Sequence, residues 1–156
     1  MEHLVYCDNA GKKGERVLDK IRNGSKTMVV RGASGRKIPH SRVHEGELLY
    51  FMEKGTTSIC VKAIVKKVEN FVKLSEEDIN RTLEERQPKL NLSEKQKVRW
   101  HKKCLCLVEF EGVEELCPPL AFEHQGNMDD WLILEKIEDV VVGTSIPYDY
   151  QNARFK

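Results

Sequence analysis

The sequence predicts one α+β domain, a small and partly closed β-barrel with an N-terminal helix and a helical insert. Three observations favour this fold class. Several short apolar segments alternate with the two-residue period of strands. Helical periodicity occurs once near the N-terminus and twice in the middle of the chain. The length of 156 residues, without repeats or a low-complexity tract, is that of a single domain.

The N-terminal third predicts a strand, a helix and a second strand. Residues 4–7 are a short apolar run, which we expect to be a strand. Residues 13–23 have apolar side chains at helical spacing, and Gly24 follows where a glycine commonly ends a helix. Residues 27–31 are apolar in their middle and predict the next strand, after which a basic loop begins.

The middle of the chain predicts a hairpin and then a helical insert over about 75–102, which we expect to form a separate helical lobe. Residues 47–52 and 58–68 are the hairpin strands, with a glycine turn between them. Two capping-box sequences open the helices of the insert. These helices are expected over 76–86 and 94–102, with Pro88 separating them.

The C-terminal third is less regular. Residues 105–110 predict one more strand, and residues 116–120, which contain two prolines, predict a rigid extended turn. An apolar segment over 131–142 fits either a strand or a helix. The C-terminal extension covers about 113–156, and its last part, from residue 143, is expected to be loosely ordered.

The net charge of +1 conceals a polarity along the chain. Residues 1–110 carry 23 Lys and Arg against 15 Asp and Glu, whereas residues 111–156 carry 3 against 10. One interpretation is a basic working face with an acidic remainder. The alternative is that the two segments interleave in space and their fields cancel.

The cysteines predict reduced thiols rather than a metal site. Their number is odd, and no Cys-x-x-Cys pair is present. We expect core cysteines in a cytoplasmic protein, with no cofactor, no metal and no membrane span. The five are Cys7, Cys60, Cys104, Cys106 and Cys117.

The segment from Gly24 to Arg31 is the first candidate for chemistry. Lys26 follows the glycine that ends the helix, and Arg31 follows five residues later. Strand side chains alternate, so the two cations share a cleft only if Lys26 lies in the turn and Arg31 lies at the strand exit.

This segment carries a family resemblance. Gly24-x-Lys26-x-x-x-x-Arg31, followed by a loop and the strand sequence over 45–51, resembles the ASCH domain of the PUA-like superfamily. The similarity covers residues 13–72 and, more loosely, 103–112, and the segment with two prolines resembles small archaeal members. The resemblance implies a β-barrel with a cleft, whose relatives bind RNA or modified nucleobases.

One ASCH branch is similar to amidohydrolases that remove the acetyl group of N4-acetylcytidine with a Lys, a Thr and a Glu. Lys26 matches the lysine of that branch. The threonine position is Val29, which has no atom that can attack a carbonyl. The glutamate would fall in the insert, where Glu84 and Glu85 are the nearest carboxylates. Whether the protein is an enzyme stays open.

The loop that follows Arg31 is the second candidate, because it is basic and has no acidic residue up to His44. Guanidinium groups bind phosphate oxygens with two donors, and a serine adds a neutral donor. The alternatives are a solvated loop and an Arg31 that pairs with Glu45 or Glu47. The predicted anion- and nucleic-acid-binding residues are Lys26, Arg31, Arg36, Lys37, His40, Ser41 and Arg42.

Three functions therefore compete. The first is binding of RNA, or of a modified nucleoside or nucleotide, in a cleft whose floor is formed by Lys26 and Arg31. The second is hydrolysis of a modified nucleoside such as N4-acetylcytidine, with Lys26 as the catalytic residue. The third is an adaptor whose acidic end contacts another protein. A third basic cluster surrounds Trp100, for which we favour packing over base stacking.

Overall fold

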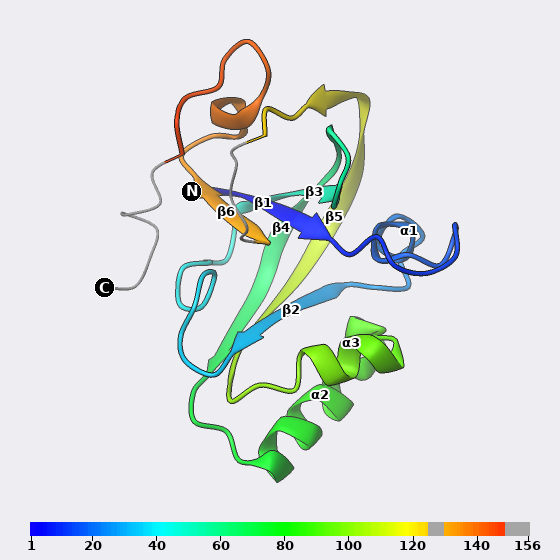
Figure 1. Ribbon diagram of the computed structural model, residues 1–156, viewed down its shortest axis with the longest axis vertical. Helices are drawn as coiled ribbons and strands as arrows, with labels where there is room; N and C mark the ends of the chain where they lie inside the picture. Colours follow the sequence, from blue (N-terminus) through cyan, green and yellow to red (C-terminus); the bar gives the residue numbers. More distant parts are fainter. Residues whose placement is uncertain (125–129, 149–156) are drawn as a thin grey trace.

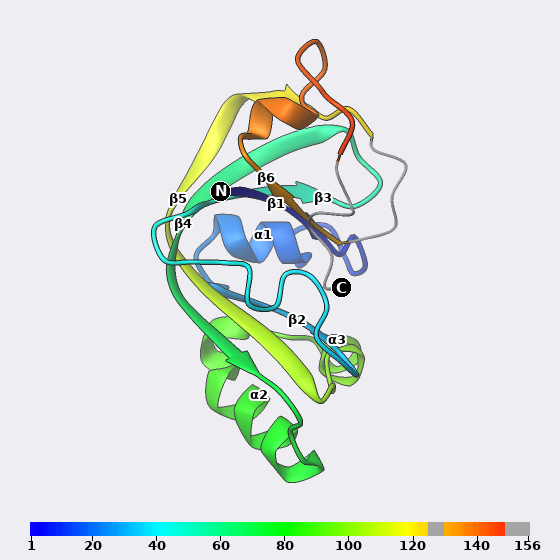
Figure 2. The same ribbon diagram turned by 90° about the vertical axis from the view of Figure 1, so that its left-hand side faces the viewer.

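The computed structural model describes residues 1–124 and 130–148. Six strands form one sheet in the order β2-β5-β4-β3-β1-β6, which curls into a half-barrel (Figures 1 and 2). All neighbours are antiparallel except the parallel pair β1 and β3. The expected barrel class is confirmed. The strands are β1 (Glu2–Cys7), β2 (Met28–Ala33), β3 (Leu48–Glu53), β4 (Ser58–Phe71), β5 (Cys104–Ala121) and β6 (Trp131–Leu134).

Short helices flank this sheet. Helix α1 (Val17–Arg22) lies on its concave side, and α2 (Glu76–Leu90) and α3 (Glu94–Arg99) lie beside β2 (Figure 2). A 3-10 turn, η1 (Ile137–Val140), follows β6. No helix of the described part is long and apolar enough to span a membrane.

The main core fills the inside of the curl. Alternate residues of β4 are buried, namely Ile59, Val61, Ala63 and Val65, as the sequence predicts for one face of a strand. Leu18 and Ile21 of α1 pack on the inward-facing residues of the sheet. Helix α1 therefore covers part of the concave face of the sheet.

Strand β2 is buried on both faces, which explains its uninterrupted apolar sequence. Val29 belongs to the main core, whereas Met28 and Val30 pack with Ile79 and Leu83 of α2. The insert was expected to be a separate helical lobe. Instead it covers the outer face of β2 and β5. The strand part of the Gly24–Arg31 segment therefore lies between the main core and the helices of the insert.

Several predicted boundaries were wrong for local physical reasons. The first helix begins at Val17 and not at residue 13, because Gly11 and Gly14 adopt positive φ. Pro88 lies inside the last turn of α2, and the helix ends instead at the left-handed residue Asn91. The ambiguous segment 131–142 contains both a strand and a 3-10 turn.

The predicted turn over 116–120 is also wrong, because β5 continues through it to Ala121. Pro118 and Pro119 lack an N–H, which excludes them from most central strands. Strand β2 pairs with β5 only up to Glu109, and the register of β5 with β4 shifts between Glu115 and Leu120, so neither proline has to donate a ladder hydrogen bond. The expectation of a loose tail falls partly on residues 149–156, which lie outside the described residues.

Candidate nucleotide-binding site

Lys26 is a buried cation in the turn between α1 and β2. Gly24 has φ 81°, and the backbone N–H of Lys26 donates to the carbonyl of Lys20, which turns the chain back over the helix. The side chain is 3% exposed, and its Nζ donates to the carbonyl of Leu90 at the end of α2. Burial, and then the positive charge of Arg31, lower the pKa of Lys26 to about 7.

Arg31 joins the two ends of the curled sheet. It belongs to the edge strand β2, yet its Nη2 donates to the carbonyl of Tyr6 in β1 at 2.7 Å. Its Nη1 donates to the carbonyl of Val30 at 2.9 Å, and its buried Nε has no partner in the described residues. Burial lowers the pKa of Arg31, and the charge of Asp130 opposes this effect.

The alternative that Arg31 pairs with Glu45 or Glu47 is wrong. Glu47 accepts instead from His3 at 2.9 Å and pairs with the N-terminal amine at 3.1 Å. The guanidinium of Arg31 lies against two indole rings, 5.3 Å from the centre of Trp100 and 5.7 Å from that of Trp131.

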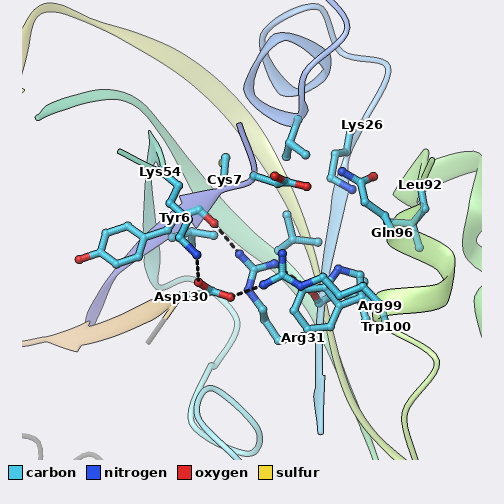
Figure 3. Close-up of a pocket in the computed structure, with 15 residues that line it drawn as sticks. Tyr6, Cys7, Lys26, Arg31, Lys54, Leu92, Gln96, Arg99, Trp100 and Asp130 are labelled. Carbon is cyan, nitrogen blue, oxygen red and sulfur yellow. Dashed lines mark hydrogen bonds and ion pairs between the residues drawn. The ribbon is translucent and has the colours of Figure 1, made fainter. Parts of the chain in front are cut away.

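Asp130 is the carboxylate at the mouth of the site. Its Oδ2 accepts from Nη2 of Arg99 at 2.7 Å, and its Oδ1 lies 3.6 Å from Nζ of Lys54 (Figure 3). The guanidinium of Arg99 also covers the ring of Trp100, 4.6 Å from its centre. Residues from β1, β2, α3 and the segments next to β3 and β6 therefore meet at one point.

Two neighbouring hollows lie here, and they share the lining residues Arg31, Arg99, Trp100 and Asp130. The inner pocket reaches Lys26 and Cys7 and has a volume of about 30 Å³, which holds about one water. The outer pocket has a volume of about 350 Å³. A ligand the size of a nucleobase therefore fits only the outer pocket. Its lining is Arg31, Gly32, Lys37, Ile38, Arg99, Trp100, Lys102, Asp130 and Trp131.

The structure does not place the seven predicted binding residues in a single pocket. Lys26 and Arg31 line the inner pocket together, and Arg31 and Lys37 line the outer pocket. Arg36 is exposed and lines neither of them. Arg42 lines a different hollow, beside Met1 and Tyr148.

His40 and Ser41 also require correction, because they hold the shape of the loop. His40 is 4% exposed, its Nε2 lies 3.1 Å from the carbonyl of Phe71, and its Nδ1 lies 2.8 Å from Oγ of Ser41. The Phe71 carbonyl can only accept, so Nε2 donates and Nδ1 accepts from the serine hydroxyl. Of the cations in this loop, Lys37 lines the outer pocket, and anion binding by Arg36 and Arg42 stays a prediction.

Four residues that the sequence interpretation did not assign to the site are prominent in it: Lys54, Arg99, Trp100 and Asp130. Arg99 and Trp100 lie in a basic cluster that was noticed but was expected to pack. Trp100 does pack against the α2 cluster, but it also remains partly exposed in both pockets. No sequence motif marks Lys54 or Asp130 as a site residue, because only the order of the strands in the sheet brings them close to the site.

The residues expected for an amidohydrolase are not assembled around Lys26. Val29 is buried in the main core, and Glu85 pairs with Arg86. Glu84 lines a hollow between α2 and α3. The described lining of the inner pocket contains no serine or threonine. Burial raises the pKa of the Cys7 thiol to about 12, which makes it a poor nucleophile.

The cysteines are free thiols, and three of them, Cys7, Cys104 and Cys106, are buried. Cys60 is half-buried and Cys117 is exposed. Within residues 1–124 and 130–148 no cluster of His, Cys, Asp and Glu has the arrangement of a metal site.

Ion pairs connect the basic and acidic parts of the chain. Arg22 pairs with Glu115 at 2.9 Å and Lys62 with Glu114 at 3.6 Å. Asp130 is paired with cations in the same way. The two segments therefore interleave in part.

No family model and no curated protein sequence matches this chain. Solved structures of ASCH from Zymomonas mobilis do match its fold. A Ser-to-Ala mutant of ZmASCH aligns over 86% of this chain and 89% of its own, with a TM-score of 0.60 and 12% identity. The chain has the ASCH fold.

Two further ZmASCH structures agree. A Tyr-to-Phe mutant aligns over 77% of this chain and 75% of its own, with a TM-score of 0.55 and 14% identity. Another structure of ASCH from Zymomonas mobilis aligns over 73% of this chain and 69% of its own, with a TM-score of 0.52 and 11% identity. At such identities only the fold is shared, so the roles of residues in this ASCH-fold protein depend on its own geometry.

Proposed function

We propose that this protein binds RNA, or a nucleotide-like ligand, in the outer pocket. The observation that carries the proposal is that four cations line one pocket together with a partly exposed indole. Arg31, Lys37, Arg99 and Lys102 supply donors for phosphate oxygens, and the part of the Trp100 ring that Arg31 and Arg99 leave exposed supplies a surface for a base. The free thiols fit a cytoplasmic protein, where RNA is available.

The shape of the pocket favours an unpaired nucleotide over a duplex. Its volume of about 350 Å³ lies in the range of small-molecule sites. A base can enter such a hollow only when it is free of its partner strand, because duplex RNA exposes its backbone and not the faces of its bases. The proposed ligand is therefore single-stranded RNA or a free nucleotide.

The test measures binding of a fluorescent single-stranded RNA at several salt concentrations. The variant Lys37→Gln/Lys102→Gln removes two exposed cations of the outer pocket. We expect weaker binding and a log–log salt slope that is flatter by roughly 1.4, at about 0.7 per lost phosphate contact. Lys12→Gln/Lys67→Gln is the matched control, since both lysines are exposed and line neither pocket. Equal effects of both variants would contradict the proposal.

One observation favours hydrolysis of a modified nucleoside as a second candidate. With a pKa of about 7, the amine of Lys26 is partly neutral at neutral pH and can accept a proton from a water in the inner pocket, as a general base does. Turnover of N4-acetylcytidine by the wild type, and its loss in Lys26→Met, would support this function. Turnover that survives in Lys26→Met would exclude Lys26 as its catalytic residue.

A further inference from the structure

Asp130 lies among more positive charge than it can neutralise. Its carboxylate contacts Arg99 at 2.7 Å and Lys54 at 3.6 Å, and it faces the charge of Arg31. We infer that this carboxylate occupies an anion subsite, in which the phosphate group of a ligand replaces it. Asp130 would then act as an internal competitor at the mouth of the pocket.

The surrounding donors are only partly used, which is the first argument. The Nε of Arg31 is buried and has no partner in the described residues. The Nζ of Lys54 is too far from Asp130 for a hydrogen bond. A carboxylate offers two oxygens and one charge, whereas a phosphate monoester offers three oxygens and nearly two charges. The phosphate therefore matches three cations better.

The second argument is that displacement of the Asp130 side chain costs little. Its side chain is 22% exposed and that of Arg99 is 44% exposed, and ion pairs of this kind contribute little to stability because water screens them. The main-chain carbonyl of Asp130 separately accepts from the N–H of Tyr6 at 3.0 Å. That bond holds the backbone next to β6 while the carboxylate turns away.

The inference deepens the proposed function and rests on it for the nucleotide, though not for the anion. Inorganic phosphate and the phosphate of a nucleotide share the chemistry that the subsite recognises. A nucleotide would add a base over Trp100, next to Arg99. The subsite thus selects phosphorylated ligands over neutral nucleosides.

The test compares Asp130→Asn with the wild type by isothermal titration calorimetry, with inorganic phosphate, cytidine 5′-monophosphate and cytidine as separate probes. We expect Asp130→Asn to bind both phosphorylated probes about fivefold more tightly, which corresponds to the loss of one partly exposed ion pair. Affinity for cytidine is expected to stay the same. Arg99→Gln in the Asp130→Asn background is expected to abolish the gain.

Asp8→Asn is the matched control. Asp8 also lines the inner pocket and its removal changes the net charge equally, but its Oδ1 accepts from the N–H of Ala10 at 3.0 Å, a bond that asparagine can keep. Equal gains in Asp8→Asn and Asp130→Asn would overturn the inference, since the effect would then be general electrostatics. So would an unchanged or weaker affinity in Asp130→Asn.

The two proposals fail in different ways. Phosphate that binds more tightly to Asp130→Asn, with a nucleotide that binds no better than phosphate, supports the anion subsite and contradicts nucleotide binding. The opposite result is a nucleotide affinity that is unchanged in Asp130→Asn but falls in Lys37→Gln/Lys102→Gln. It supports nucleotide binding and contradicts the anion subsite. If Asp130→Asn melts at a lower temperature than the wild type, Asp130→Ser is used in its place. The serine removes the same negative charge without introducing an amide, and its affinities for the three probes are compared with those of the wild type.

Discussion

The indole Nε1 of Trp131 donates a hydrogen bond to Nδ1 of His3 at 3.0 Å. An indole N–H can only donate, so Nδ1 of the histidine must accept and its proton lies on Nε2. That proton is donated to Oε1 of Glu47 at 2.9 Å. The pair thus fixes a neutral tautomer of His3 beneath the ring that Arg31 contacts.

This arrangement predicts how stability depends on pH. Burial lowers the pKa of His3 below its usual 6.5, although Glu47 opposes the change and the N-terminus and His44 assist it. The unfolded chain then binds more protons, so the free energy of unfolding should fall as pH drops from about 6.5 to 5. Urea denaturation at several pH values measures this. His3→Gln should flatten the curve, and a wild type that is flat over this range would contradict the assignment.

Lys26→Met is predicted to stabilise the protein at neutral pH. The pKa of about 7, against 10.5 for a free lysine, means that burial of the ammonium costs about 4 kcal/mol at pH 7. The variant leaves the Leu90 carbonyl unpaired, which costs about 1–3 kcal/mol. We expect a net gain of about 2 kcal/mol in the free energy of unfolding.

The pH dependence separates this cause from better packing. The cost is greatest below pH 7 and declines as pH rises toward 10.5, because the unfolded lysine then also loses its proton. The advantage of Lys26→Met over the wild type should therefore shrink by roughly 2 kcal/mol between pH 7 and pH 9. A gain that does not vary with pH would show that Lys26 is not the source.

Arg31→Met is predicted to destabilise the fold. The change removes the bonds to the carbonyls of Tyr6 and Val30 and the contacts with both indoles. Loss of charge-assisted bonds between the ends of the sheet should cost about 2–4 kcal/mol. If Arg31 only bound a ligand, its replacement would change the melting temperature little. Thermal denaturation decides between them, with Lys37→Gln as a surface control.

Gly32→Ala is predicted to disturb the contact between β2 and β5. A Cβ at this position would lie 2.7 Å from a side-chain methyl of Leu105 and 3.0 Å from the carbonyl oxygen of Cys104. We expect a loss of about 1–3 kcal/mol. Gly35→Ala is the matched control, because its Cβ would meet nothing within 4 Å. Similar melting temperatures for the two variants would contradict the close packing.

The fold class and the meeting of Lys26 with Arg31 in one pocket could be predicted from sequence because their signals are local. Period-two alternation identifies β4, and Gly24 with Lys26 predicts a tight turn before a strand. Asp130 could not be predicted, since it meets Lys54 and Arg99 only through the order of strands in the sheet.

Two other errors came from residues whose effect depends on their neighbours. Pro118 breaks a central strand but is tolerated in β5, because the register with β4 shifts there and the proline has no ladder partner. His40, in a basic loop, resembles a ligand contact, yet its ring is buried against the Phe71 carbonyl. In both cases the environment, not the residue type, decides the role.

The most direct test of nucleotide binding in the outer pocket uses the fluorescence of the two tryptophans. Trp131 is 1% exposed and hydrogen-bonded to His3, whereas Trp100 is partly exposed in the pocket. Titration with a short oligouridine should quench the wild type saturably, because a base stacks on Trp100. Trp100→Leu should abolish the quenching and weaken binding, with the Trp131 signal unchanged. Quenching of equal amplitude and midpoint in Trp100→Leu would contradict the proposed site.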